Sequence, residues 1–149
     1  MSRDTYCTFT VCDYLFGVPV YEVQEIVRNL ERTRVPLAPE AIDGLINLRG
    51  QIVPAIDVRH RLALPPRPED IEPMNVIVKA GGEPVSLLVD EIGDVIEVDA
   101  AKFEEPPDTL LETGRDLIHG VMKLDSELML LLNIDKCVCV TEATRSESR

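Results

Sequence analysis

The sequence predicts a mainly β protein built from two copies of one small unit, and three observations support this fold class. Hydrophobic residues make up 45% of the 149 residues, aromatic residues make up 4%, and there is no Trp. A core of aliphatic and β-branched side chains is typical of packed sheets. The stretch 44–61, GLINLRGQIVPAIDVRHR, has the pattern of a β-hairpin. That pattern returns once, in the stretch 120–137.

The first hairpin is predicted from two apolar runs, Leu45–Leu48 and Ile52–Val58, that flank the dipeptide Arg49-Gly50. Gly50 can adopt the positive φ that such a tight turn needs, so Arg49 would be held at a rigid tip. Pro54 has no N–H to donate to a neighbouring strand. The second strand should therefore run along an edge of its sheet, or be bulged near its middle.

The second copy of the hairpin reads GVMKLDSELMLLLNIDKC, and its first residue, Gly120, matches Gly44. Its strand 128–132 is apolar at every position, so neither face of it suits contact with water. We expect one face to fill its own unit and the other face to be covered by the first copy.

A second internal match pairs residues 23–26 (VQEI) with residues 89–92 (VDEI). The matching hairpins are further apart along the chain than these two segments are, which predicts a longer connection inside the second copy. We assign this insertion to residues 103–113.

A helix is predicted over residues 20–30 because its apolar residues fall at helical spacing on one face. Glu22 and Glu25 would lie near its start and Arg28 near its end, which is the order that the helix dipole favours. One interpretation of the pattern is an ordinary packed amphipathic helix. The apolar face comprises Val20, Val23, Ile26, Val27 and Leu30.

The other elements are predicted from alternation and turn residues. A Pro-rich loop should follow the first hairpin, and the C-terminal residues 141–149 should form a flexible tail. The expected strands are 5–11, 15–18, 75–79, 83–88 and 95–98, the expected loop is 64–73, and a single turn is expected at 40–43.

Composition narrows the classes of partner. The formal net charge is −12, which argues against nucleic acid and anionic membranes, because both select for basic patches. No apolar run is long enough to span a membrane, so no direct membrane insertion is expected, and the start lacks the layout of a signal peptide. We therefore expect a cytoplasmic protein. The four cysteines, Cys7, Cys12, Cys137 and Cys139, are irregularly spaced for a zinc site and are interpreted as reduced thiols.

No catalytic motif is present. The two histidines, His60 and His119, do not form a metal-binding HExxH pattern, and there is no GxSxG elbow or phosphate-binding glycine loop. We expect no enzyme activity, no cofactor and no metal.

Four motifs together make the chain resemble a CheW-type chemotaxis adaptor over residues 5–140. They are VQEI (23–26), G-x-x-NLRG-x-[IV]-[IV]-P-x-[IV]-D (44–57), VDEIGDVIEV (89–98) and the second hairpin. The resemblance implies one CheW-like domain of two intertwined five-stranded SH3-like β-barrels with short helices. It implies a first barrel over about 14–72 and a second barrel over about 5–13 plus 73–140.

The resemblance also implies a function and partners. Such a protein is a non-catalytic adaptor that couples the cytoplasmic tips of chemoreceptors to a CheA-type histidine kinase. The kinase's regulatory domain has the same fold, so pairing with it is expected, as is pairing with other CheW-like proteins in rings. The positions that match the receptor-binding residues are Val23, Glu25, Ile26, Val27, Gly44, Leu48 and Arg49.

Three alternatives remain open from the sequence. Arg49 is either an exposed turn residue or a two-pronged ion-pair partner that ties Glu25 to the hairpin. The pathway served is either flagellar chemotaxis or a non-flagellar motility or gene-regulatory array. An unrelated small-barrel binding module would need exposed aromatic residues and a basic groove, which this composition disfavours.

Overall fold

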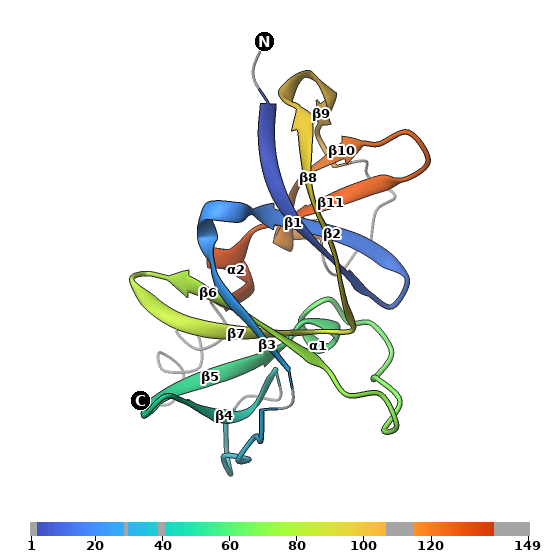
Figure 1. The fold of residues 1–149 in the computed structure, drawn as a ribbon. Coiled ribbons are helices and arrows are strands. Elements are labelled where there is room, and N and C mark those ends of the chain that lie inside the picture. Colours follow the sequence, from blue (N-terminus) through green and yellow to red (C-terminus); the bar gives the residue numbers. More distant parts are fainter. Residues whose placement is uncertain (1–2, 29, 39–40, 107–114, 139–149) are drawn as a thin grey trace.

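The computed structural model describes residues 3–28, 30–38, 41–106 and 115–138 (Figure 1). Within these residues the chain forms strands in two sheets together with short helical segments, so the predicted fold class is confirmed. The strands are β1 (Arg3–Val11), β2 (Tyr14–Pro19), β3 (Val23–Arg28), β4 (Ile42–Leu48), β5 (Gln51–Asp57), β6 (Met74–Ala80), β7 (Glu83–Val89), β8 (Glu91–Asp99), β9 (Phe103–Glu104), β10 (Ile118–Lys123) and β11 (Leu128–Leu132). The helical segments are η1 (Val20–Glu22), α1 (Val58–Arg61), η2 (Ala100–Lys102), η3 (Arg115–Leu117) and α2 (Ile134–Val138).

The chain passes between the two sheets twice. One sheet has the strand order β8-β1-β2-β11-β10-β9, and the other has the order β3-β6-β7-β5-β4. The crossings follow β2 and β7, so the five-stranded sheet is formed by residues between 23 and 89. Strand β2 therefore belongs to one sheet and strands β6 and β7 to the other. The barrel limits themselves stay a prediction.

The two hairpins have the same register, which confirms the match made from the sequence. In the first hairpin Ile42 pairs with Ile56, and in the second hairpin Ile118 pairs with Leu132. Each hairpin has a register shift directly after this pair, before its matching glycine, Gly44 or Gly120. The two hairpins therefore share the position of the register shift as well as the pairing of their strands.

The second proposed match, between VQEI and VDEI, is wrong. Phe9 pairs with Ile92 in one sheet, and Val78 pairs with Val23 in the other. Phe9 and Val78 are as far apart along the chain as Val23 and Ile92 are. The β1–β8 pair is therefore equivalent to the β6–β3 pair. The VQEI and VDEI segments are thus similar in sequence but shifted by three positions in structure. The predicted insertion at 103–113 begins in β9, and residues 107–114 lie outside the described residues.

The predicted helix over residues 20–30 is also wrong. Residues 20–22 form the single turn η1, and the next residues form β3, which pairs with β6. A register shift between Val23 and Glu25 inserts an extra residue into β3. Because of this bulge, Val23 and Ile26 both pair with residues of the core between the sheets, Val78 and Val76. Side chains three residues apart thus share a face, which imitates helical spacing.

Three hydrophobic clusters hold the fold together. The largest contains residues of both sheets, such as Phe9 and Phe16 from one and Val76 and Leu87 from the other. Each sheet also has a smaller cluster of its own. Strand β11 contributes to two of them, as predicted from its apolar sequence: Leu130 and Leu132 enter the shared cluster, and Met129 and Leu131 enter the cluster of their own sheet.

Pro54 lies in an interior strand and not in an edge strand. Strand β5 pairs with β4 along its length, but its parallel pairing with β7 begins only at Ala55. The residue that lacks an N–H therefore comes just before the part of β5 that has two neighbours. Among the described residues, no helix is long and apolar enough to cross a membrane.

Candidate functional site

Arg49 occupies a strained position at the tip of the first hairpin. Its φ is 51° and that of Gly50 is 87°, as in a type I′ turn. The left-handed conformation is unfavourable for a residue with a Cβ, by roughly 1 kcal/mol. The turn is supported by Asn47, whose Oδ1 accepts a hydrogen bond from the Gly50 N–H at 2.8 Å.

The Arg49 guanidinium forms a two-pronged ion pair with Glu25 of β3. Nη1 donates to Oε1 at 3.0 Å, and Nη2 donates to Oε2. The hydrogen bond to Arg49 lowers the pKa of the Glu25 carboxyl below its ordinary value. The Arg49 side chain remains 68% exposed, whereas that of Glu25 is 25% exposed. Arg49 is thus the ion-pair partner considered above and also an accessible cation.

The other five predicted site residues have different environments. Leu48 is 6% exposed and belongs to the core of the five-stranded sheet, and Gly44 is buried. Val27 packs against the same core, and Val23 packs against the core between the sheets. Ile26 is 40% exposed. Of the predicted apolar contacts, Ile26 is therefore the most accessible.

Three accessible apolar residues were missed by the sequence reasoning. Val95 on β8 is 60% exposed, Tyr21 is 85% exposed and Val20 is 39% exposed. Val95 pairs with Cys7 of the shared core, just as Ile26 pairs with Val76. Along the chain, Cys7 is as far from Val76 as Ile26 is from Val95. Phe9 and Val78, the equivalent residues of β1 and β6, have the same separation. The two strands thus present exposed aliphatic side chains at equivalent positions.

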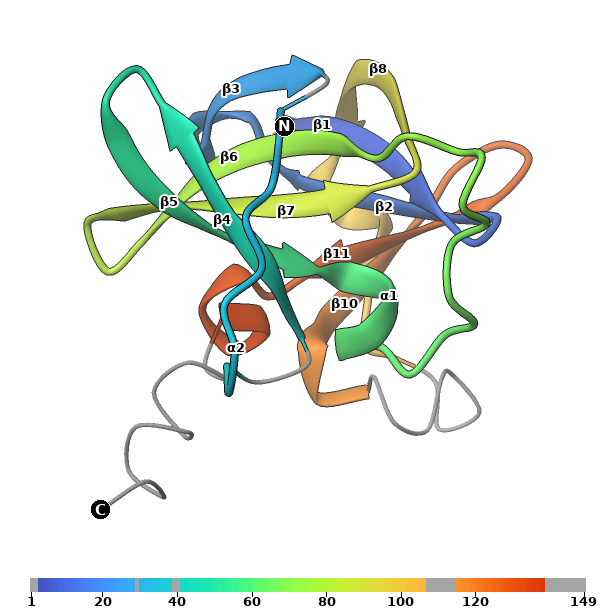
Figure 2. The same ribbon diagram turned by 90° about the horizontal axis from the view of Figure 1, so that it is seen from below.

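Strands β3 and β8 are the outer strands of their sheets, and they run along one side of the molecule, away from α1 and α2 (Figure 2). A cavity of about 420 Å³ lies at η1, which leads into β3. Burial is the main cause that raises the pKa of Tyr6 and the only one that lowers the pKa of His119. The cavity therefore combines aromatic and apolar side chains with the charged side chains of Arg3 and Asp4. The cavity is lined by Arg3, Asp4, Thr5, Tyr6, Pro19, Val20, Tyr21 and His119.

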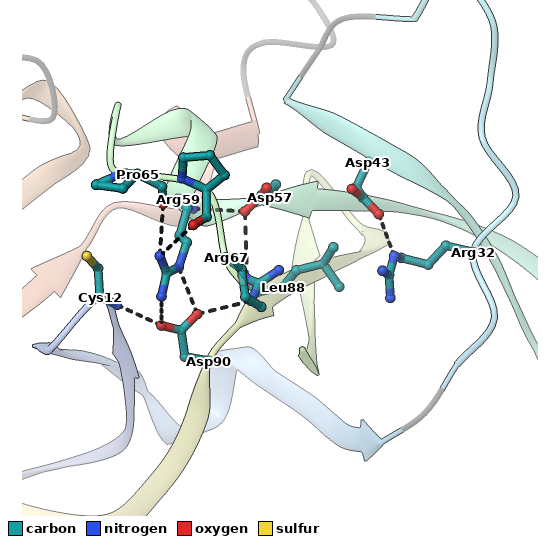
Figure 3. A network of polar contacts seen from close by, with 10 residues as sticks. Cys12, Arg32, Asp43, Asp57, Arg59, Pro65, Arg67, Leu88 and Asp90 are labelled. Atoms are coloured by element: carbon teal, nitrogen blue, oxygen red, sulfur yellow. Dashed lines mark hydrogen bonds and ion pairs between the residues drawn. The ribbon is translucent and has the colours of Figure 1, made fainter. Parts of the chain in front are cut away.

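A buried polar network surrounds Asp90, on the segment that joins β7 to β8 (Figure 3). Its carboxylate accepts hydrogen bonds from Arg59 of α1, from Arg67 of the Pro-rich loop and from the Cys12 N–H. Burial raises the pKa of Asp90, but the hydrogen bonds from Arg59, Cys12 and Arg67 outweigh burial and leave that pKa lowered. The network is a structural link between distant segments and was not predicted from the sequence.

The cysteines and histidines do not assemble into a recognisable reactive centre within the described part of the chain. No group of three or more His, Cys, Asp or Glu residues is arranged there to hold a metal ion. Cys137 is fully buried, and burial raises its pKa to about 11. Its thiol is therefore protonated at neutral pH. Cys139 lies outside the described residues.

Comparison with known proteins gives the family. Residues 5–140 match the CheW-like domain. The chain is 29% identical over 135 residues to the chemotaxis protein CheW of Treponema pallidum, which covers 87% of this chain and 78% of that protein. It is 32% identical over 133 residues to CheW of Bacillus subtilis, which covers 89% of this chain and 83% of that protein.

The fold agrees with this relationship. The crystal structure of the scaffolding protein TtCheW from Thermoanaerobacter tengcongensis matches with a TM-score of 0.83 and 29% sequence identity. The match covers 91% of this chain and 92% of that chain. The chain therefore belongs to the CheW-like family, the non-catalytic scaffold proteins of chemotaxis that couple receptors to the kinase CheA.

Proposed function

We propose that this protein binds the cytoplasmic tip of a chemoreceptor through β3, β8 and the β4–β5 turn, and a CheA-type kinase through a separate surface. The observation that carries the proposal is the accessible Arg49 beside the edge strand β3, which carries the exposed aliphatic residue Ile26. A receptor tip is a helical hairpin, and such a helix binds by placing its apolar face on an apolar surface. Arg49 adds a cation whose fork suits a carboxylate or a backbone carbonyl.

Only some of the seven residues first considered are proposed to contact the receptor. Ile26 and Arg49 would touch the receptor directly, and Glu25 would orient Arg49. Leu48 and Gly44 would support the hairpin from the inside, because both are buried. Val95 joins the proposed surface on the strength of its 60% exposure and its equivalence to Ile26.

The kinase partner is proposed to be the kinase's regulatory domain, and contacts with other CheW-like proteins would extend the assembly into rings. Heterologous contacts between related domains close into rings when the rotation allows it. We further propose that the protein acts in the cytoplasm, where receptor tips and the kinase are found. A non-flagellar array remains the second candidate pathway, and it requires the same surfaces.

The test is receptor-dependent stimulation of kinase autophosphorylation. Purified protein is titrated into a cognate receptor fragment and kinase, and the initial rate of phosphate incorporation is measured. The proposal expects stimulation only when all three components are present. The Asp43→Asn variant is the control, because it loses an ion pair with Arg32 that lies outside β3, β8 and the β4–β5 turn. Absence of stimulation by the wild-type protein contradicts the proposal.

A further inference from the structure

Asp90 is the single residue between β7 and β8, at the point where the chain leaves the five-stranded sheet and enters the six-stranded sheet (Figure 1). Its side chain is 13% exposed. A carboxylate at this depth is costly unless it is fully paired. Its partners come from three separate parts of the chain.

One of these parts belongs to the six-stranded sheet. The N–H of Cys12, in the turn between β1 and β2, donates to Asp90 Oδ2 at 2.8 Å. The N–H of Asp90 in turn donates to the carbonyl oxygen of Thr10 at 3.0 Å. Asp90 is thus fixed to the β1–β2 hairpin through both its side chain and its backbone.

The other two parts flank the five-stranded sheet. Arg59, on the helix after β5, donates from Nε to Asp90 Oδ1 at 3.1 Å and from Nη2 to Oδ2. Arg67, on the loop before β6, donates from Nε to Asp90 Oδ1 at 3.1 Å. Each arginine side chain is 9% exposed. Asp90 therefore connects elements of both sheets (Figure 3).

The arginines are themselves held in place by further contacts. Nη1 of Arg59 donates to the carbonyl oxygen of Pro65 at 2.8 Å, and Nη2 of Arg67 lies 3.7 Å from Asp57 Oδ1. Apolar packing between the sheets is not directional, whereas two-pronged ion pairs fix both distance and angle. The network thus supplies a directional restraint that the shared hydrophobic core does not.

We propose that Asp90 is a positioning residue for receptor recognition, which sets the angle between the two sheets and so the placement of Val95 relative to Ile26. Strand β8 begins one residue after Asp90, so a change of chain direction there displaces Val95 further along the strand. Ile26 moves with the other sheet because β3 pairs with β6. This inference rests on the proposed function, since both residues belong to the proposed receptor surface.

The test uses two variants and a control. Asp90→Asn removes the charge of the shared carboxylate, and Arg67→Gln removes one arm while the Arg59–Asp90 pair remains. The control, Asp43→Asn, breaks the separate ion pair with Arg32 (Figure 3). Amide residual dipolar couplings, fitted separately for each sheet, report the angle between the sheets. Titration with a receptor-tip hairpin reports affinity.

Both Asp90→Asn and Arg67→Gln are expected to change the fitted angle between the sheets or to widen the range of angles that fits the couplings. Both should also weaken binding of the receptor-tip hairpin by about tenfold. Asp43→Asn should leave both quantities unchanged. Folded variants with the wild-type angle, or with affinity within about twofold of wild type, overturn the proposal. If Asp90→Asn does not fold, Arg67→Gln decides alone by the same criteria. Wild-type protein that does not bind the hairpin refutes the proposed function, while the couplings still test the angle.

Discussion

Arg49 and Glu25 join the tip of the first hairpin to the edge strand β3 through two parallel hydrogen bonds. The pair is asymmetric, because the arginine is largely exposed and the glutamate is largely covered. An exposed ion pair contributes little to stability. Arg49 is kept in a left-handed turn conformation with most of its side chain in water, which supports the receptor contact that we propose for it.

The first prediction concerns Arg49 itself. Arg49→Ala should lower the affinity for the receptor by about tenfold or more, because a fork donor at the centre of an interface is a frequent hot spot. The melting temperature should hardly change, since the turn and Gly50 are retained. Arg49→Lys keeps the charge but loses the fork, so it should restore only part of the activity. If folded Arg49→Ala stimulates kinase autophosphorylation as strongly as wild type does, Arg49 is only a turn residue.

The matching glycines of the two hairpins lead to the second prediction. A Cβ on Gly44 would lie 2.8 Å from the carbonyl oxygen of Thr33, which forms a backbone bridge with Leu45 on the edge of the sheet. A Cβ on Gly120 would lie 2.0 Å from the Phe103 ring, on the equivalent edge strand β9. Gly44→Ala and Gly120→Ala should each destabilise the fold by about 1–3 kcal/mol, measured by urea unfolding.

The two substitutions should differ in how they can be relieved. The Phe103 ring is 41% exposed, so it can turn away, and Phe103→Ala should recover stability in the Gly120→Ala background. At Gly44 the obstacle is backbone, and truncation of a side chain cannot remove it. If Gly44→Ala is as stable as wild type, the backbone at Thr33 can move away from the added Cβ at no cost in stability.

Sequence reasoning succeeded where the signal was local. The tight turn at Arg49-Gly50 is fixed by short-range geometry, and the same sequence pattern returns at 120–137, so the hairpin and its repeat were predicted. The helix over residues 20–30 was wrong because a β-bulge placed Val23 and Ile26 on one face. A bulge depends on pairing with a distant strand, and periodicity alone does not reveal it.

The site was predicted only in part for the same reason. Arg49 and Glu25 were identified, and their ion pair is present. Leu48 is apolar, as expected for a receptor contact, but its side chain packs into the core. Which face of the strand a residue occupies depends on the register of pairing and cannot be read from the residue type. The network of Asp90 joins residues up to 78 positions apart, and no local pattern marks such a contact.

Acid should destabilise the protein through Asp90, and this is the third prediction. The pKa of Asp90 is lower in the folded protein than its ordinary value because Arg59, Cys12 and Arg67 donate to the carboxylate. The unfolded chain therefore takes up a proton more readily. The stability that Asp90 contributes is complete above about pH 4 and is lost as the pH falls through its folded pKa.

The measurement is urea unfolding of wild type and Asp90→Asn between pH 7 and pH 3. The variant should be less stable at neutral pH, because two buried arginines lose their shared anion. The difference between the two proteins should shrink as the pH is lowered, because the wild-type carboxyl becomes neutral as well. A difference that is constant across this range would contradict a contribution from the ionised carboxylate.

The fourth prediction separates surface from core among the apolar residues of the site. Val95→Asp should fold, because Val95 is 60% exposed, and it should weaken binding of a receptor-tip hairpin by about tenfold or more. On the proposed surface this charge would be buried against the apolar face of the receptor helix, which is unfavourable for an unpaired charge. Ile26→Asp is expected to act in the same way.

Val35→Asp provides the matched control for Ile26→Asp, because Val35 is 38% exposed, similar to Ile26, and lies outside β3, β8 and the β4–β5 turn. It should bind the hairpin like wild type. Leu48→Ala should instead lose about 2–4 kcal/mol of stability through the cavity it leaves in the core. Folded Leu48→Ala should still bind, so affinity and unfolding free energy must be measured together. If Val35→Asp weakens binding as much as Val95→Asp and Ile26→Asp do, the receptor surface does not lie along β3 and β8.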